Sequence, residues 1–153
     1  MPRIRVKDPK TDEPLLIGWR EKVSLPQLGV GTFVAKVDTG ARSAALHAID
    51  IRQTDHQVSF TLPFKGRNHH CTLPLKGKRT VKSSSGHREV RVVVETLVKV
   101  GRHTLTIDVT LTDRADMGVA MLLGRASLGG RFLVHPARSH ILSAKKKKKT
   151  KPK

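Results

Sequence analysis

A single carboxylate followed by small residues is the first candidate for chemistry, in the sequence Asp-Thr-Gly-Ala at positions 38–41. The apolar run Phe33–Val37 before it has the pattern of a strand, so Asp38 stands at a strand end, where it can be presented into a cavity. Gly40 and Ala41 let a second backbone come close, and the Thr39 hydroxyl could bond a neighbouring copy of the same loop. Taken alone, Asp-Thr-Gly is more often an ordinary turn.

A second motif, Met-Leu-Leu-Gly-Arg at residues 121–125, favours a functional role for Asp38 over an ordinary turn. By itself, a buried strand that ends in Gly-Arg is usually only core. An arginine directly after a buried glycine is nevertheless well placed to bind a carboxylate or a carbonyl and to lock the Asp38 loop. We therefore expect Arg125 to support that loop. Asp113-Arg114 could form a second bracing pair.

Between these motifs lies a basic segment, residues 77–89, with a Ser-Ser-Ser-Gly centre. Its composition also fits a solvated loop. Its cations outnumber the single Glu89, however, and a buried substrate carboxylate needs a cation or a hydrogen-bond donor. The segment therefore predicts contact with an acidic substrate. The expected substrate-binding residues are Arg42, Arg79, Lys82, Ser83, Ser84, Ser85, Gly86, His87 and Arg88.

Composition narrows the class of protein. The 153 residues suit one domain, and the formal net charge of +18 favours polyanionic partners such as nucleic acid, the ribosome or an acidic peptide. The chain has no Tyr, which excludes tyrosine-based chemistry. One cysteine, Cys71, cannot form an internal disulfide, and no apolar run resembles a signal peptide or is long enough to cross a bilayer. These features predict a cytoplasmic protein without membrane partners.

Short strands separated by glycine and proline dominate the pattern. Two period-two runs around the turn Gly101-Arg102 predict a hairpin, and no long helical period appears. We expect a closed all-β barrel or a sandwich, with at most one short helix, near residues 126–130. The predicted strands are 33–37, 44–51, 58–64, 90–100, 105–111, 118–123, 131–134 and 140–142. Flanking them are a loose arm, residues 1–14, and a disordered lysine-rich tail, residues 144–153, around a domain at residues 15–143.

The sequence His69-His70-Cys71 suggests zinc, but the chain has no HExxH motif and no second cysteine. Adjacent histidines on a strand point in different directions, so they rarely chelate one ion together. We therefore interpret these residues as a surface loop and expect no metal. No GxxxxGK[ST] loop is present either, so we expect no cofactor.

Several separated motifs together resemble one bacterial family, labelled "ATP-dependent zinc protease" and regarded as retropepsin-like aspartic peptidases (RimB-like), which are associated with RimK-type ATP-grasp glutamate ligases. The resemblance covers residues 15–143. It is carried by Gly-Trp-Arg-Glu at 18–21, Leu-Pro-x-Leu-Gly at 25–29, and the stretches 35–48, 81–87, 110–114, 121–125 and 132–134. It implies a retropepsin-like closed barrel in which the strand with Leu122, Leu123 and Gly124 packs against the Asp38 loop. It also implies a hairpin flap from residues 77–89. The implied activity is that of a peptidase acting on glutamate tails, for instance on a small-subunit ribosomal protein.

Aspartic peptidases use two carboxylates that share a proton. This chain has one Asp-Thr-Gly, so a complete site needs the Asp38 of a second copy, which predicts a homodimer. Asp113 or Asp116 is an intramolecular alternative without the turn that would aim it. Two other functions stay open: a non-catalytic RNA- or ribosome-binding β-barrel, for which the chain has few base-stacking aromatics, and a zinc-dependent peptidase. The lysine tail could hold the enzyme near ribosomal RNA through contacts with phosphate groups.

Overall fold

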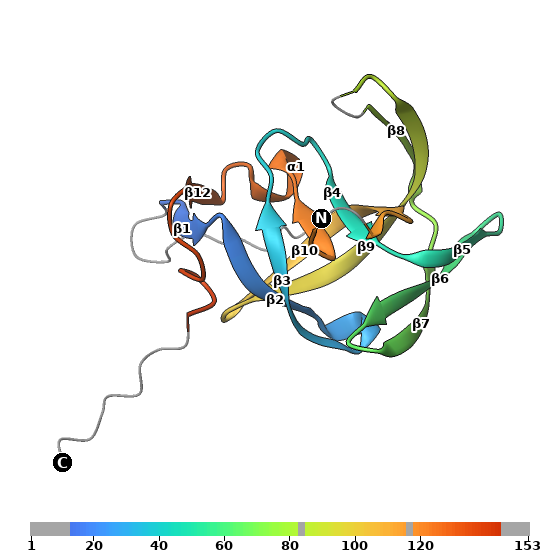
Figure 1. Cartoon of the computed structure of the whole chain (residues 1–153), viewed down its shortest axis with the longest axis horizontal. Coiled ribbons are helices and arrows are strands. Elements are labelled where there is room, and N and C mark those ends of the chain that lie inside the picture. The colour runs from blue at the N-terminus through green and yellow to red at the C-terminus, as the bar shows by residue number, and fades with distance from the viewer. Residues whose placement is uncertain (1–12, 83–84, 116–117, 145–153) are drawn as a thin grey trace, which may run out of the picture.

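A closed six-stranded barrel forms the body of the protein (Figure 1). The computed structural model describes residues 13–82, 85–115 and 118–144. The barrel strands follow the order β10-β4-β11-β3-β2-β9, and β9 also pairs with β10, which closes the ring. The predicted all-β closed barrel is therefore confirmed. Its strands are β2 (Arg20–Leu25), β3 (Val30–Val37), β4 (Ala44–His47), β9 (Arg88–Val100), β10 (His103–Thr112) and β11 (Met121–Leu123).

Two smaller sheets flank the barrel. One is a parallel pair of β1 (Leu15–Gly18) and β12 (Phe132–His135). The other is an antiparallel sheet in the order β5-β6-β7. Its strands are β5 (Ile49–Gln53), β6 (Gln57–Phe64) and β7 (Arg67–Pro74). The helices are the single turns η1 (Pro26–Leu28) and α1 (Arg125–Leu128), and no helix among the described residues could span a membrane.

The β9–β10 hairpin supplies much of the core. Its register pairs His103 with Val100, and Gly101 at the turn has a φ of 59°, which favours glycine. The predicted hairpin and its turn are thus confirmed. Alternation buries one face of each strand inside the barrel, including Val94, Val98, Leu105, Ile107 and Val109. The interior is aliphatic because the chain has so few aromatic residues.

The first part of β9 leaves the barrel and pairs with β8 (Gly77–Lys82). This β8–β9 arm extends from the barrel at the upper right of Figure 1. Its register runs from Gly77 opposite Val93 to Lys82 opposite Arg88, so β8 and the first part of β9 pair as the two strands of the hairpin that the resemblance implies. β9 is therefore one long strand with two roles. Its N-terminal part is half of the arm, and its C-terminal part is a strand of the barrel.

Several predicted elements are wrong in their bounds. Residues 44–51 form two strands in different sheets, because β4 pairs with β10 and β11 whereas β5 pairs with β6. The strand predicted at 118–123 begins only at Met121, and the helical turn spans Arg125–Leu128 rather than 126–130. Residues 140–142 are not a strand. The His140 N–H donates to the Arg20 carbonyl of β2, but the N–H groups of Ile141 and Leu142 donate to the Glu21 side chain, so no strand pairing develops.

The interpretation of His69-His70-Cys71 as a surface loop is also wrong, because these residues lie in β7 and pair with β6. Cys71 is 8% exposed, and burial raises the pKa of its thiol. His70 contacts the Thr61 hydroxyl through Nδ1 at 3.0 Å. Among the described residues, no three His, Cys, Asp or Glu side chains gather in a way that could hold a metal ion.

One buried carboxylate fixes the last described residues to the barrel. Glu21, on β2, is fully buried. Its Oε2 accepts the backbone N–H groups of Gly18 at 2.6 Å, Ile141 at 3.0 Å and Leu142 at 3.1 Å. Its Oε1 accepts the Ser143 backbone N–H at 2.9 Å and the Ser143 hydroxyl at 2.6 Å. Burial by itself raises the pKa of Glu21, but the hydrogen bonds from Ser143, Gly18 and Leu142 outweigh it and hold the pKa below the ordinary value of 4.5.

We expect Glu21→Gln to lower the free energy of unfolding by about 2–4 kcal/mol, because the amide can accept fewer of these hydrogen bonds and buries an NH₂ group among donors. Urea unfolding followed by circular dichroism measures this loss. Asp55→Asn, in an exposed bend, is the matched control and should change stability by no more than about 0.5 kcal/mol. Equal effects of the two variants would contradict a structural role for Glu21.

The depressed pKa of Glu21 also predicts a dependence on pH. The stabilisation by its charged form is complete above about pH 4.5 and is lost as the pH falls from there through the lower pKa of the folded state. The stability difference between the wild type and Glu21→Gln should therefore shrink on acidification below about pH 4.5. A difference that stays constant down to pH 3 (about 1.5 units lower) would show that the charge of Glu21 is not its source.

Candidate active site

The strand β3 delivers Asp38 to the rim of the barrel. Its last residue, Val37, is the parallel register partner of Leu123 in β11, and the Asp38 N–H continues the ladder by donating to the Leu123 carbonyl at 2.9 Å. Val37 and Leu123, the last residues of β3 and β11, are buried, whereas Asp38 itself is half-buried. A rigid strand end thus carries a carboxylate that solvent can reach.

Asp38 is oriented by its own turn. The Ala41 N–H donates to the Asp38 carbonyl at 3.2 Å, and the Gly40 N–H donates to the Asp38 Oδ1 at 3.0 Å. A backbone N–H that donates to a carboxylate oxygen fixes the direction of the side chain. Thr39 and Gly40 are exposed at the tip of this turn. The turn therefore presents both its carboxylate and its backbone outward.

The segment after β11 is hydrogen-bonded to the Asp38 loop and holds it in place. The N–H groups of Arg125 and Ala126 donate to the carbonyls of Ala41 and Arg42, both at 2.9 Å. The Arg125 guanidinium reaches further and donates through Nη1 to the Thr39 carbonyl at 2.8 Å. The helix α1 and the β3–β4 loop accordingly lie side by side in Figure 1. Every residue of the turn from 39 to 42 is therefore held by this segment or by the turn itself.

Gly124 makes this contact close enough to work. A Cβ atom at this position would lie within van der Waals overlap of the Ser43 backbone, 2.5 Å from its carbonyl carbon and 2.9 Å from its nitrogen. Only a residue without a side chain allows the two backbones to touch. Leu123 is buried beside it, and Leu122 is half-buried. The Leu-Leu-Gly-Arg run therefore packs directly against the loop that carries Asp38.

The inner face of the β8–β9 arm contacts the same loop. Arg79 donates through Nη1 to the Ser43 hydroxyl at 2.6 Å. Its cross-strand partner is Arg91, which is only 8% exposed and donates through Nε to Glu89 at 3.1 Å. The other oxygen of Glu89 accepts the Thr112 hydroxyl at 3.1 Å. The arm is thus tied to the barrel on both sides, at Ser43 and at Thr112.

The remaining predicted substrate-binding residues lie elsewhere on the arm or loop. Lys82 and Arg88 are exposed on the outer face of the arm, because they alternate with the inward residues of their strands. Ser85, Gly86 and His87 form its exposed tip, Arg42 is exposed beside the Asp38 turn, and Ser83 and Ser84 lie outside the described residues. Asp113 is exposed, and the Arg114 N–H donates to the Nδ1 of His47 at 3.0 Å.

The sequence analysis did not single out Ser43 or the pairing of Glu89 with Arg91. Val90 is 65% exposed, and the buried face of β9 changes between Val93 and Val94. The change occurs where β9 leaves the barrel for the arm. The spacing of two between Glu89 and Arg91 was a usable signal, since it places both side chains on one face.

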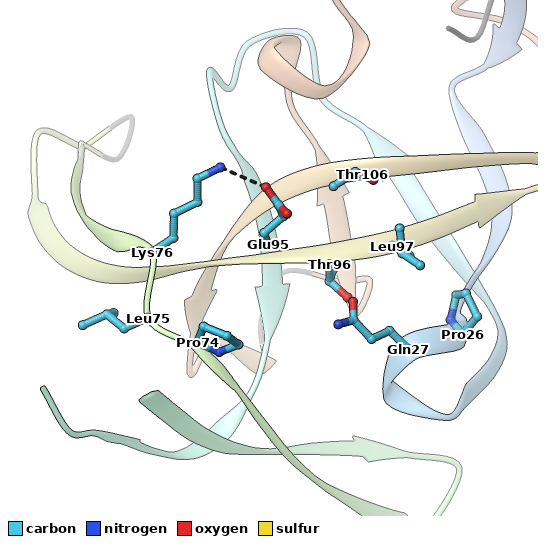
Figure 2. Close-up of a pocket in the computed structure, with 9 residues that line it drawn as sticks. All are labelled: Pro26, Gln27, Pro74, Leu75, Lys76, Glu95, Thr96, Leu97 and Thr106. Atoms are coloured by element: carbon cyan, nitrogen blue, oxygen red, sulfur yellow. Dashed lines mark hydrogen bonds and ion pairs between the residues drawn. The ribbon is translucent and has the colours of Figure 1, made fainter. Parts of the chain in front are cut away.

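A separate cavity of about 810 Å³ lies between η1, the end of β7 and the outer side of the β9–β10 hairpin (Figure 2). Apolar walls from Pro26, Pro74 and Leu97 surround it. At its edge, Lys76 pairs with Glu95 at 3.1 Å and with Asp108 at 2.6 Å. No residue of the Asp38 loop or of the inner arm face lines this cavity, so it is not part of the candidate active site.

We expect Gly124→Ala to destabilise the protein by about 1–3 kcal/mol, because the new methyl group overlaps the Ser43 backbone. Thermal unfolding measures the loss. Gly31→Ala is the matched control, since a Cβ atom on Gly31 meets nothing within 4 Å. A Gly124→Ala variant as stable as this control would contradict the tight contact between the two backbones.

Comparison with known proteins agrees with the geometry. A family model described as "RimB-like: Retropepsin-like aspartic endopeptidase RimB" matches residues 16–145. A Legionella pneumophila protein of unknown function has a solved structure that superposes with a TM-score of 0.71, at 31% identity over 84% of this chain and 98% of that one.

Curated relatives include two proteins named "Probable alpha-L-glutamate ligase". The protein from Shewanella halifaxensis is 36% identical over 86% of this chain, and the one from Desulfotalea psychrophila is 36% identical over 80%. The chain spans only 31% and 28% of their respective lengths. The family model, in contrast, covers nearly all of the described barrel, including the Asp38 turn and the Leu-Leu-Gly-Arg segment. The chain therefore belongs to the RimB-like family of retropepsin-like aspartic endopeptidases.

Proposed function

We propose that this protein is an aspartic endopeptidase in which Asp38 activates water to hydrolyse peptide bonds. The observation that carries the proposal is the construction of the Asp38 turn. Its carboxylate stands at a strand end, is oriented by the Gly40 N–H, and is held in place by the segment that contains Arg125. Such preorganisation is what a group needs if it is to act on a bound water molecule.

The chemistry requires two carboxylates that share one proton, because two like charges at close range do not both ionise readily. The ionised partner takes a proton from water, and the protonated partner gives a proton to the peptide carbonyl as the water oxygen attacks. The Asp38 turn contributes one carboxylate. We propose that the second is the Asp38 of another copy, related by a two-fold axis that passes between the two turns.

The surface of the described barrel supports such a dimer. Thr39 and Gly40 are exposed at the tip of the turn, where two copies would meet. Leu16 and Leu133 are register partners on the parallel β1–β12 pair and are 43% and 60% exposed. Adjacent exposed leucines on one face are typical of a contact surface between chains. β12 follows α1 closely in the sequence, so this face adjoins the segment that holds the Asp38 loop.

The proposed substrates are proteins that carry glutamate tails, such as a ribosomal protein modified by an ATP-grasp ligase. The names of the relatives support this, since proteins called probable alpha-L-glutamate ligases contain a region similar to this chain. The net charge of +18 suits an acidic substrate in the cytoplasm. The lysine-rich residues 145–153, which lie outside the described part of the chain, would add an attraction to ribosomal RNA.

Asp38→Asn should abolish cleavage of a defined oligoglutamate-tailed peptide, with a loss of at least about a thousandfold in kcat/KM, and leave the thermal unfolding temperature within a few degrees of wild type. Product release measured by mass spectrometry tests this. Asp113→Asn is the matched control, and its full activity would exclude Asp113 as the second carboxylate. Retained cleavage by Asp38→Asn would contradict the proposal that Asp38 is catalytic.

A mixing experiment tests whether the site is shared between copies. If each dimer needs two Asp38 carboxylates, adding Asp38→Asn protein to wild type and allowing subunits to exchange should lower activity below that of wild type alone. Sedimentation analysis of the wild type should show a dimer at the concentrations used. Unchanged activity in the mixture, with exchange verified by a fluorescent label, would mean that one chain suffices.

The charge of the chain also favours a second candidate function, a non-catalytic RNA- or ribosome-binding barrel. Under this alternative Asp38 is dispensable, and tight RNA binding survives Asp38→Asn. Titration of a fluorescent RNA oligonucleotide at several salt concentrations distinguishes the two functions when it is combined with the cleavage assay. Tight RNA binding without any peptide cleavage would favour the binding function.

A further inference from the structure

The inner face of the β8–β9 arm carries more positive charge than its partners balance. Arg79 and Arg91 are direct cross-strand partners on this face, so their Cβ atoms lie about 4.5–5.5 Å apart. Like charges in this position repel each other and destabilise a sheet. Glu89, on the same face, pairs with Arg91 at 3.1 Å. Two guanidiniums against one carboxylate leave an excess of one positive charge.

The excess resides on Arg79. Arg91 is buried and has its carboxylate partner, and that carboxylate is itself fixed by the Thr112 hydroxyl. Arg79, which is half-buried, donates to the Ser43 hydroxyl, a neutral group, and takes part in none of the ion pairs found among the described residues. A guanidinium has five donors arranged as a fork that matches a carboxylate. Most of this capacity is left for a ligand.

Arg79 contacts the loop that carries Asp38, so its remaining hydrogen-bond donors lie near the candidate site. Ser43, which it touches, packs its backbone against Gly124 and follows the Asp38 turn in the chain. The cation therefore lies against the loop that carries the candidate catalytic turn. Lys78, its neighbour on β8, is exposed and points away from the loop. Adjacent cations on one strand thus have different environments, and only one of them is directed at the site.

We propose that Arg79 binds a side-chain carboxylate of the peptide substrate beside the Asp38 loop, and that the Arg91–Glu89–Thr112 chain holds the arm so that this cation stays in position. The inference rests on the proposed peptidase function and adds to it a residue that determines specificity. One carboxylate neutralises the excess charge of the inner face. Selection for an acidic residue next to the scissile bond then comes from a fixed, half-buried arginine, and not from the general basicity of the protein.

Binding to the inactive protein tests the inference separately from cleavage. In an Asp38→Asn background, fluorescence anisotropy with a labelled hexaglutamate peptide compares Arg79→Gln with Lys78→Gln, each of which removes one charge from β8. Arg79→Gln should weaken binding by about tenfold or more, as expected for the loss of charge-assisted hydrogen bonds, whereas Lys78→Gln should weaken it by about twofold or less. Arg79→Lys should recover part of the loss, because it keeps the charge without the fork.

Two further comparisons sharpen the result. A hexaglutamine peptide should bind weakly and should not distinguish Arg79→Gln from Lys78→Gln. In the active protein, Arg79→Gln should remove most of the preference in kcat/KM for a glutamate over a glutamine beside the scissile bond. Thermal unfolding temperatures close to that of Lys78→Gln exclude a loss of fold, and the partial recovery in Arg79→Lys is a second safeguard.

Equal weakening of hexaglutamate binding by Arg79→Gln and Lys78→Gln would overturn the inference, because it would assign binding to diffuse charge. The proposed function can fail independently. If Arg79→Gln selectively loses hexaglutamate binding but the wild type cleaves nothing, the carboxylate site stands and the peptidase assignment falls. If the wild type cleaves through Asp38 while Arg79→Gln keeps its preference for glutamate, the peptidase stands and the site falls. Loss of RNA-oligonucleotide binding on Arg79→Gln without loss of hexaglutamate binding would equally reject a carboxylate site.

Discussion

The contact between the backbones at Gly124 and Ser43 is the constraint on which the candidate site depends. Because no side chain separates them, the N–H groups that follow Gly124 can reach the carbonyls of the Asp38 loop, and the Arg125 guanidinium can reach Thr39. Backbone groups do not change with rotamer, so this arrangement fixes a turn more firmly than side-chain packing would. The barrel supplies two strands, β3 and β11, whose buried last residues Val37 and Leu123 lie side by side, and the loop is built on their ends.

The sequence was most informative where residues repeat with a simple period. The alternation through β9 and β10 predicted the main hairpin, and the absence of a helical period predicted an all-β barrel. It was least informative where one strand serves two structures. β9 changes its buried face between Val93 and Val94 as it passes from the arm into the barrel, and residues 44–51 split between two sheets. In both places the local pattern reports a half-buried strand, but the partner is decided by tertiary contacts.

The Asp38 turn and the Leu-Leu-Gly-Arg segment were identifiable because their residue types are unusual in combination. Ser43 was not, because a serine in a loop is a common feature, and the spacing of Glu89 and Arg91 places them on one face of a strand without showing what they contact. Their importance depends on the register of β8 with β9, which places Arg79 opposite Arg91. The buried Glu21 network was missed for a related reason: most of its partners, at residues 141–143, lie more than a hundred residues away in the chain, and backbone N–H groups leave no mark in a sequence.

Glu21 has a consequence for the way such a domain can be joined to other proteins. Its carboxylate binds Gly18 near the start of the described chain and Ser143 near its end, and β1 lies parallel to β12. The first and last parts of the folded unit are therefore adjacent in space and fixed to each other. A domain with adjacent ends can be inserted into a host chain, or appended to one, without distorting either partner. This architecture fits the two relatives named as probable alpha-L-glutamate ligases, in which the region similar to this chain makes up 31% and 28% of the length.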